Sequence, residues 1–230
     1  AYFKWMRPVN KTGPRILGRL PELAPLSPED VKKKMEEGAL VVDVRRPKDF
    51  ARGHLPGAYH IFLGNAFSSW LGWIVPPGRT LIFVDTSSES HEEIVRRAIR
   101  IGYDDMSGYL KGGMDAWKSA GYPVSTSGLI MPAELSRKLN SKNEIFVLDV
   151  REDVEWKEGH IPGATHIPLG ELQKRINEIP RTCPVAVTCA QGIRSSSAVS
   201  LLQREGLQEI ENIVGGTVAW EKAELPLEKE

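Results

Sequence analysis

The segment TCAQGIRSSSAV, residues 188–199, contains the side chains best suited to covalent chemistry, and it directly follows the Val-rich run PVAV. A cysteine thiolate is a strong nucleophile, and the free N–H groups at a helix start, a nearby cation and a glycine turn all stabilise it. Gly192 allows the turn, Arg194 supplies the cation, and a helix is expected to begin near Ser195. We therefore expect Cys189 to be an ionised and reactive thiol.

The elements that position this thiol occur twice in the chain. ALVVDVRRPKDFARGHLPGAYHI at residues 39–61 returns as IFVLDVREDVEWKEGHIPGATHI at residues 145–167, and two further segments match in the same order. Short Val-rich runs such as LVVDV and VAVTC are typical of strands buried on both faces, and each is followed by a helical pattern. The sequence therefore predicts an α/β fold with two tandem domains, each a mainly parallel sheet flanked by helices.

The same comparison sets the predicted domain boundaries. Residues 1–24 form an N-terminal extension, residues 25–122 the first domain and residues 129–230 the second. Residues 123–128 connect the two domains, because the Pro, Ser, Thr and Gly residues around them follow no sustained period.

Features present in both copies are candidates for architecture, and features present in one copy are candidates for chemistry. His54 and His160 precede equivalent Pro-Gly turns, so we expect each to make a structural hydrogen bond. The counterpart of Cys189 is Asp85, which cannot act as a thiol nucleophile, and the counterpart of Arg194 is Ser90. We therefore expect an inert first domain and a catalytic second domain.

The combination of DVRE, GHIPGA, CAQGIRS and GGTVAW resembles the rhodanese family over nearly all of residues 25–230. This resemblance implies a tandem protein in which the cysteine takes a sulfane sulfur from thiosulfate or a low-molecular-weight persulfide and passes it to a thiol or cyanide. It implies Cys189 as the catalytic residue, with Arg194 steering the anionic donor. The implied substrate-binding loop consists of Ala190, Gln191, Gly192, Ile193, Arg194 and Ser195.

Three further residues, Gln191, Arg151 and Glu152, bear on the predicted site. The best-known tandem rhodaneses have a lysine two residues after the cysteine, and Gln191 at that place weakens the case for thiosulfate as the favoured donor. Arg151 and Glu152 are candidate supporting residues. Glu152 replaces Arg46 of the first copy, so it is a candidate partner for Arg151 or Arg194, with an exposed acid of no role as the alternative.

Residues 1–20 are similar to the tail of the metallo-β-lactamase-like domain in persulfide dioxygenase–rhodanese fusions. This second resemblance implies a larger protein with such a domain upstream. It also implies that this larger protein acts on a low-molecular-weight persulfide, such as glutathione persulfide.

Two other functions stay open. A rhodanese-fold phosphatase also uses a cysteine and an arginine, but with five intervening residues, whereas this chain has the four residues AQGI. A regulatory or docking module without catalysis is the other alternative, and it suits the first copy better than the second.

The composition narrows the remaining partners and the compartment. The 30 basic and 30 acidic residues give a formal charge of zero without a basic stripe, so we expect no nucleic-acid partner. No uninterrupted apolar run is long enough to span a membrane. The two cysteines and scattered histidines suggest neither a disulfide framework nor a metal site. We therefore expect a cytoplasmic protein without a cofactor, acting on a small sulfur donor and a thiol acceptor.

Overall fold

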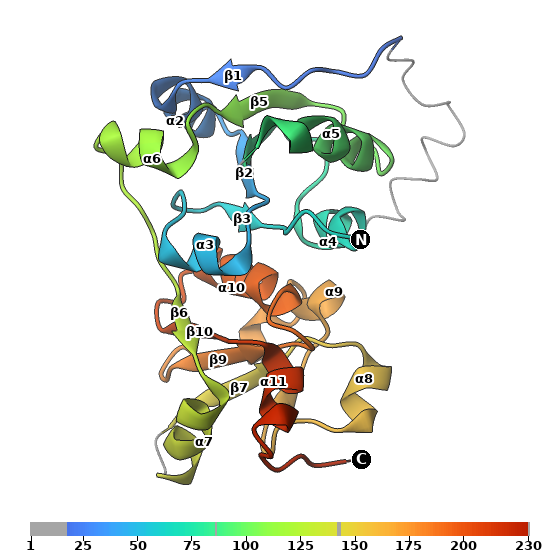
Figure 1. The fold of residues 1–230 in the computed structure, drawn as a ribbon, viewed down its shortest axis with the longest axis vertical. Coiled ribbons are helices and arrows are strands. Elements are labelled where there is room, and N and C mark those ends of the chain that lie inside the picture. Colours follow the sequence, from blue (N-terminus) through green and yellow to red (C-terminus); the bar gives the residue numbers. More distant parts are fainter. Residues whose placement is uncertain (1–17, 86, 142–143, 230) are drawn as a thin grey trace. The chain divides into compact units, whose positions relative to one another are not determined.

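The computed structural model describes residues 18–85, 87–141 and 144–229 (Figure 1). The extension similar to the tail of a metallo-β-lactamase-like domain lies largely outside the described residues. Contacts divide the chain into two compact units. One unit joins the described part of Ala1–Arg45 to Ile61–Val124, and the other joins Arg46–His60 to Ser125–Glu230.

The first sheet has five strands in the order β1-β5-β4-β2-β3. The pairings of β5 with β1, of β5 with β4 and of β4 with β2 are parallel. The strands are β1 (Pro25–Leu26), β2 (Leu40–Asp43), β3 (Tyr59–His60), β4 (Leu81–Val84) and β5 (Met106–Leu110). The helices are α2 (Pro28–Glu36), α3 (Pro47–Arg52), α4 (Phe67–Ile74), the 3₁₀ turn η1 (Ser88–Ser90), α5 (His91–Ile99) and α6 (Gly113–Ser119).

The second sheet repeats this topology in the order β6-β10-β9-β7-β8, and all four pairings are parallel. Its strands are β6 (Gly128–Ile130), β7 (Phe146–Asp149), β8 (Thr165–His166), β9 (Val185–Thr188) and β10 (Ile210–Ile213). The helices are α7 (Pro132–Asn140), α8 (Asp153–Glu158), α9 (Leu169–Leu172), the 3₁₀ turn η2 (Ile176–Glu178), α10 (Arg194–Arg204) and α11 (Gly216–Lys222).

Both sheets confirm the predicted α/β fold of two similar domains. Every residue of β2, β4 and β9 is buried, as a strand covered on both faces requires. The first helix, α2, begins with a capping box that Ser27 and Asp30 form around Pro28. The core of the second domain includes Ile130, Leu135, Val147, Ile161, Ala186, Ile213 and Trp220.

The residues shared by both copies have matching structural roles. Asp43 pairs with Arg45 at 2.6 Å, and Asp149 pairs with Arg151 at 2.7 Å. His54 Nδ1 lies 2.8 Å from the carbonyl oxygen of Phe50, as expected for a structural hydrogen bond. The His160 ring forms the equivalent contact with Trp156 at 3.2 Å and stacks on that ring with centroids 3.5 Å apart.

Candidate active site

Cys189 lies at the carboxyl end of a central strand in the second sheet. It directly follows β9, which lies between β10 and β7, and the loop after it leads into α10. Ligands of parallel α/β sheets bind at these carboxyl ends, where helix N-termini present free N–H groups. The cysteine is 2% exposed, so the loop encloses its side chain.

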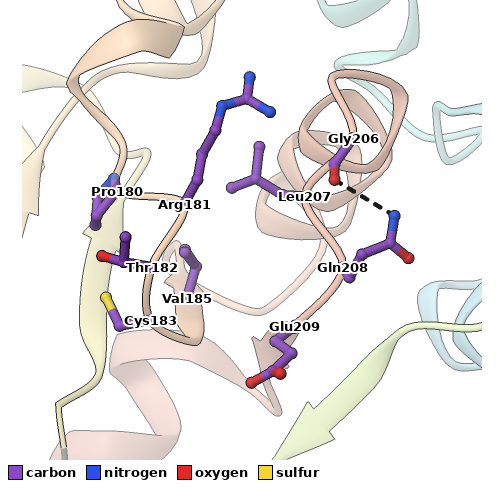
Figure 2. A pocket seen from close by; sticks show the side chains of 9 residues that line it. All are labelled: Pro180, Arg181, Thr182, Cys183, Val185, Gly206, Leu207, Gln208 and Glu209. Carbon is purple, nitrogen blue, oxygen red and sulfur yellow. Dashed lines mark hydrogen bonds between the residues drawn. The ribbon is translucent and has the colours of Figure 1, made fainter.

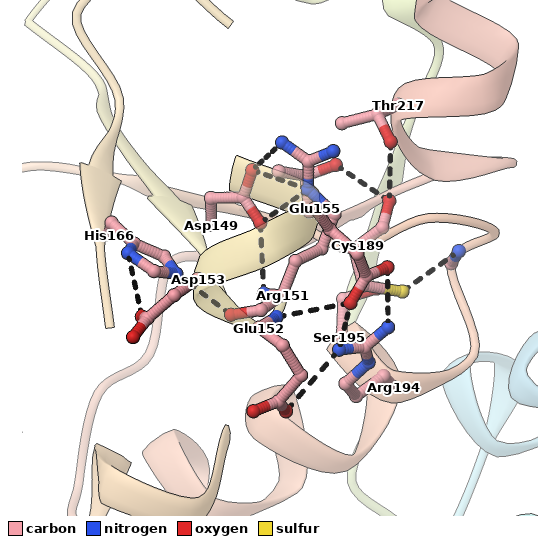
Figure 3. Close-up of polar contacts among 12 residues, drawn as sticks. Asp149, Arg151, Glu152, Asp153, Glu155, His166, Cys189, Arg194, Ser195 and Thr217 are labelled. Carbon is pink, nitrogen blue, oxygen red and sulfur yellow. Dashed lines mark hydrogen bonds and ion pairs between the residues drawn. The ribbon is translucent and has the colours of Figure 1, made fainter. Parts of the chain in front are cut away.

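The enclosed sulfur has polar neighbours. The backbone N–H of Gly192 donates to Cys189 Sγ at 3.2 Å, and Ser195 Oγ lies 3.3 Å from the same atom (Figure 3). Gly192 has φ +80°, a left-handed conformation that turns its N–H back toward the sulfur. These two contacts distinguish Cys189 from a thiol packed in a hydrophobic core.

A buried amide holds both of these groups in place. Asn212 Oδ1 accepts a hydrogen bond from Ser195 Oγ at 2.6 Å, and Asn212 Nδ2 donates to the carbonyl oxygen of Gly192 at 2.8 Å. The second bond fixes the orientation of the amide, because only its NH₂ side can donate to a carbonyl. Asn212 therefore links the turn and the hydroxyl that contact the sulfur.

The start of α11 anchors the backbone of the loop. The N–H of Thr217 donates to the carbonyl oxygen of Cys189 at 2.8 Å, and the N–H of Val218 donates to that of Ala190 at 3.1 Å. These donors belong to the first turn of the helix, where N–H groups have no partner within the helix. The first turn of α11 thus holds the backbone of the loop in place.

Arg194 is paired with acidic residues in the structure. Its guanidinium donates to both carboxylate oxygens of Glu155, at 2.8 and 2.9 Å (Figure 3). Glu152 Oε1 lies 3.5 Å from the same group. The cause is the position of α8, whose N-cap residue Glu152 and first-turn residue Glu155 both lie beside Arg194, the first residue of α10. Of the two partners considered for Glu152, the structure thus places it at Arg194.

The pKa shifts of this ion pair have opposing causes. Burial alone lowers the pKa of Arg194, but the hydrogen bonds and charge of Glu155 raise it overall, with smaller contributions from the charges of Cys189 and Glu152. Burial raises the pKa of Glu155, but hydrogen bonds from Arg194 and from the backbone of Glu152 outweigh it and lower that pKa. Both groups are therefore charged at neutral pH.

The other predicted site residues have mixed surroundings. Arg151 is buried and donates to Asp149 and to the carbonyl oxygen of Gly159, each at 2.8 Å, so it connects β7 to the end of α8. Gln191 is exposed, whereas Ile193 is half-buried.

The corresponding place in the first domain contains different chemistry. Asp85 Oδ2 lies 2.7 Å from His91 Nε2 and accepts a hydrogen bond from Ser90 at 3.0 Å. The His91 ring contacts the ring of Tyr109, with centroids 4.0 Å apart. These residues replace Cys189, Ser195 and Asn212 by position, and they include no nucleophilic sulfur.

Cys183 lies at the other end of β9. It is half-exposed and lines a cavity of about 200 Å³ together with Arg181 and Leu207 (Figure 2). Both cysteines are free, as the sequence separation along one strand requires.

Sequence reasoning did not identify three residues of the site, namely Glu155, Asn212 and Thr217. The comparison of copies could have found Asn212 and Thr217, whose counterparts are Tyr109 and Met114. Glu155 gives no such signal, because the first copy also has an acid there. Among the described residues, no group of three or more His, Cys, Asp and Glu side chains is placed to hold a metal ion.

A buried cysteine in a glycine-containing loop between a parallel strand and a helix defines a class of α/β domains built for nucleophilic cysteine chemistry. The rhodanese-like domain family matches this chain over residues 27–120 and again over residues 131–223. The two matches cover most of the sequence, so the chain belongs to the rhodanese family.

Curated relatives carry names from sulfur chemistry. A putative sulfur carrier protein of Bacillus subtilis, YrkF, is 32% identical over 133 residues, which are 58% of this chain and 64% of that protein. A putative sulfurtransferase of the same organism, YtwF, is 34% identical over 92 residues, or 40% of this chain and 88% of that protein. The thiosulfate sulfurtransferase GlpE of Coxiella burnetii is 32% identical over 83 residues, or 36% and 78% of the two chains. These relatives support a role in sulfur transfer in general.

Among solved structures, a rhodanese-related protein from Thermoplasma volcanium matches with 34% identity and a TM-score of 0.42, over 45% of this chain and 99% of the other. A thiosulfate sulfurtransferase from Pseudomonas aeruginosa matches 90% of this chain and 44% of the other, with 22% identity and a TM-score of 0.41. In the described part of the chain, no helix combines the length and apolar character needed to cross a bilayer.

Proposed function

We propose that the second domain is a sulfurtransferase that carries a sulfane sulfur on Cys189. The observation that carries the proposal is the pair of contacts on the sulfur, from Gly192 N–H at 3.2 Å and Ser195 Oγ at 3.3 Å. Both groups can donate a hydrogen bond to a thiolate. The thiolate is the form of Cys189 that attacks the donor, and it is regenerated when the sulfur is passed on.

The reaction has two balanced halves. The Cys189 thiolate attacks the outer sulfur of a persulfide R–S–SH, the S–S bond of the donor breaks, and R–S⁻ leaves while Cys189–S–SH forms. From thiosulfate the same attack releases sulfite. In the second half, an acceptor thiolate or cyanide attacks the outer sulfur of the cysteine persulfide, forms a new persulfide or thiocyanate, and restores the thiolate. The covalent intermediate predicts ping-pong kinetics.

The partners in this proposal are small molecules, namely a thiosulfate or low-molecular-weight persulfide donor and a thiol or cyanide acceptor. A cytoplasmic location suits the reaction because a reducing compartment keeps the two free cysteines as thiols. A metallo-β-lactamase-like domain upstream would supply or consume persulfide in the same protein.

The phosphatase alternative receives less support. A phosphatase needs its arginine to face the phosphoryl group, whereas the Arg194 guanidinium contacts Glu155 and Glu152. The loop of four residues between cysteine and arginine also leaves less space than a loop of five.

The test is mass spectrometry of the intact protein and of its proteolytic peptides after incubation with thiosulfate and with glutathione persulfide. One added sulfur atom on the peptide that contains Cys189, absent in Cys189→Ser, supports the proposal. A Cys183→Ser variant is the matched control and retains the modification. Phosphate release from an aryl phosphate without sulfur transfer would favour the phosphatase, and neither activity would favour a docking module.

A further inference from the structure

Helix α10, which follows the sulfur loop, is buried along most of its length. It begins at Arg194, and every residue from 195 to 202 is buried. A helix at the surface of a domain normally leaves a polar face to water. The equivalent helix of the first copy, α5, does so, because Glu92 and Arg96 form an ion pair with side chains 68% and 54% exposed. Another part of the chain therefore covers the face of α10 that its counterpart leaves exposed.

The sequence of α10 suits such a cover. Three charged residues of α5, namely Glu92, Glu93 and Arg96, correspond to Ser196, Ser197 and Ser200 of α10. The three serines are at most 2% exposed. A serine side chain is short and can be satisfied by one backbone group, whereas a buried Glu or Arg would need an ionic partner. The serine face therefore indicates close contact with another backbone segment.

A segment of the first sequence copy provides part of this cover. Contacts place Arg46–His60 in the compact unit of the second domain. The backbone N–H of His60 donates to Ser200 Oγ at 2.9 Å, and both residues are at most 1% exposed. The segment thus contacts α10 near the middle of the helix.

The same segment also contacts the carboxyl end of α10. Arg204, the last residue of the helix, donates to the carbonyl oxygen of Gly57. Its guanidinium carbon lies 4.0 Å from the centroid of the Tyr59 ring, which is the geometry of a cation–π contact. The position of α10 is therefore fixed by the segment at two places along its length.

The other end of α10 lies at the sulfur. Ser195 is the second residue of the helix, and its Oγ lies 3.3 Å from Cys189 Sγ. Ser200 is about 7 to 8 Å further along the helix axis, at about 1.5 Å per residue. A helix of this length moves as one body, so contacts at Ser200 and Arg204 also fix the position of Ser195. A displacement of about 1 Å at a reacting group can remove much of the rate.

We propose that segment 46–60 is a positioning element for the sulfur loop, and that through it the first copy, which lacks the nucleophile, serves the reaction of the second. This inference rests on the proposed sulfur transfer. The segment holds α10 at Ser200 and Arg204, and α10 keeps the Ser195 hydroxyl beside Cys189. Tyr59 and His60 are positioning residues, because they act through α10 and take no part in the bond changes.

The experiment measures alkylation of Cys189 by iodoacetamide in the full chain at pH 6 and at pH 10. At pH 10 an ordinary thiol is largely ionised, so the rate there reports access to the sulfur, and the ratio of the rate at pH 6 to that at pH 10 reports how well the loop stabilises the thiolate. Ser200→Ala removes the acceptor of the His60 N–H, and Arg204→Gln removes the cation above Tyr59. We expect each variant to lower the ratio about twofold to fivefold, since each loosens one contact of α10.

A double variant tests whether the ring and the cation act through one contact. Tyr59→Leu alone should lower the ratio about as much as Arg204→Gln, and the double variant Tyr59→Leu/Arg204→Gln should lower it no further. Arg204 is exposed, so Arg204→Gln remains folded even if Ser200→Ala does not.

Two controls separate positioning from stability. Arg100→Gln makes the same substitution at the counterpart of Arg204, the exposed residue that follows α5, and should leave the ratio unchanged. Ile161→Val removes a methylene from a residue that is 0% exposed in the core of the second domain. It should lower the urea midpoint and leave the ratio unchanged.

The outcomes test the two proposals separately. A ratio that Ser200→Ala and Arg204→Gln both leave unchanged would overturn the positioning role. An equal fall in Ile161→Val would also overturn it, because the effect would then follow the stability of the domain. The ratio is measured without a sulfur donor, so the proposed function has its own readout, which is persulfide formation on Cys189 from glutathione persulfide. If the unmodified protein forms none from this donor or from thiosulfate, the proposed function is wrong; a rate of formation that falls with the ratio in the variants supports both.

Discussion

Gly216 lies so close to Cys189 that a Cβ at residue 216 would be 2.0 Å from the Cys189 carbonyl oxygen. The same atom would lie 2.8 Å from the carbonyl carbon of Ala190, and the backbone of Gly216 has φ +59°. Close approach and a left-handed conformation both require glycine here. The approach allows the first turn of α11 to donate to the carbonyl oxygens of the loop.

We expect Gly216→Ala to displace the sulfur loop and to destabilise the second domain by about 4 kcal/mol or more, because backbone and not a flexible side chain is in the way. Gly163→Ala is the control, since Gly163 has φ +73° and no atom within 4 Å of an added Cβ. That control should lose about 1 to 2 kcal/mol from the left-handed conformation alone. Urea unfolding and the rate of sulfur transfer measure the two effects. Equal losses in both variants would show that the close approach has no consequence.

The reactivity of the two cysteines provides a second prediction. Cys189 is 2% exposed and Cys183 is half-exposed, so exposure alone predicts faster alkylation of Cys183. We expect the opposite order at pH 7, with Cys189 reacting with iodoacetamide at least about tenfold faster, because its loop stabilises a thiolate. Peptide mass spectrometry over time gives both rates in one sample. In urea the two rates should become similar, and faster alkylation of Cys183 in the folded protein would contradict an activated Cys189.

Much of this site follows from the duplicated sequence. The strand before Cys189, the turn at Gly192 and the helix that begins at Arg194 are local features, and both copies show the strand and helix patterns. The difference between Cys189 and Asp85 at equivalent positions then separates chemistry from architecture. The local sequence pattern and the comparison of the two copies are therefore sufficient to predict these residues of the site.

The partner of Arg194 could not be predicted in the same way. Glu155 is 39 residues distant in the sequence and belongs to α8, so the ion pair depends on how two helices meet at the edge of the sheet. The acid at this position also occurs in the first copy, where Ser90 occupies the place of Arg194. A contact of this kind depends on tertiary packing and not on residue type.

Asn212 provides a third prediction, because Ser195 has one hydroxyl hydrogen and two acceptors. Ser195 Oγ lies 2.6 Å from Asn212 Oδ1 and 3.3 Å from Cys189 Sγ, so the amide oxygen competes with the thiolate for the hydroxyl hydrogen. We expect Asn212→Leu to speed alkylation of Cys189 about threefold to tenfold at pH 7. A hydrogen bond to a charged group contributes about 1.5 kcal/mol or more, and the lower nucleophilicity of the stabilised thiolate offsets part of that gain.

The double variant Asn212→Leu/Ser195→Ala identifies the cause of that gain. If the released hydroxyl stabilises the thiolate, adding Ser195→Ala removes the gain. If loss of the bond between Asn212 and Gly192 simply opens the loop, the gain persists in the double variant and the competition is wrong. Ser196→Ala, at the neighbouring buried serine, is the control and should not alter the gain.

The pairing of Glu155 with Arg194 predicts how stability responds to acid. Hydrogen bonds lower the pKa of Glu155 below its usual 4.5 despite its burial, so the folded state binds a proton less readily than the unfolded chain. This contribution is therefore present above pH 4.5 and is lost as the pH falls through the lower folded pKa. The difference in unfolding free energy between the unmodified protein and Glu155→Gln, measured in urea, should be constant near neutral pH and shrink below pH 4.5. Because other carboxylates titrate in both proteins, the difference isolates Glu155. A difference that stays constant or grows on acidification would show that the ion pair does not stabilise the fold.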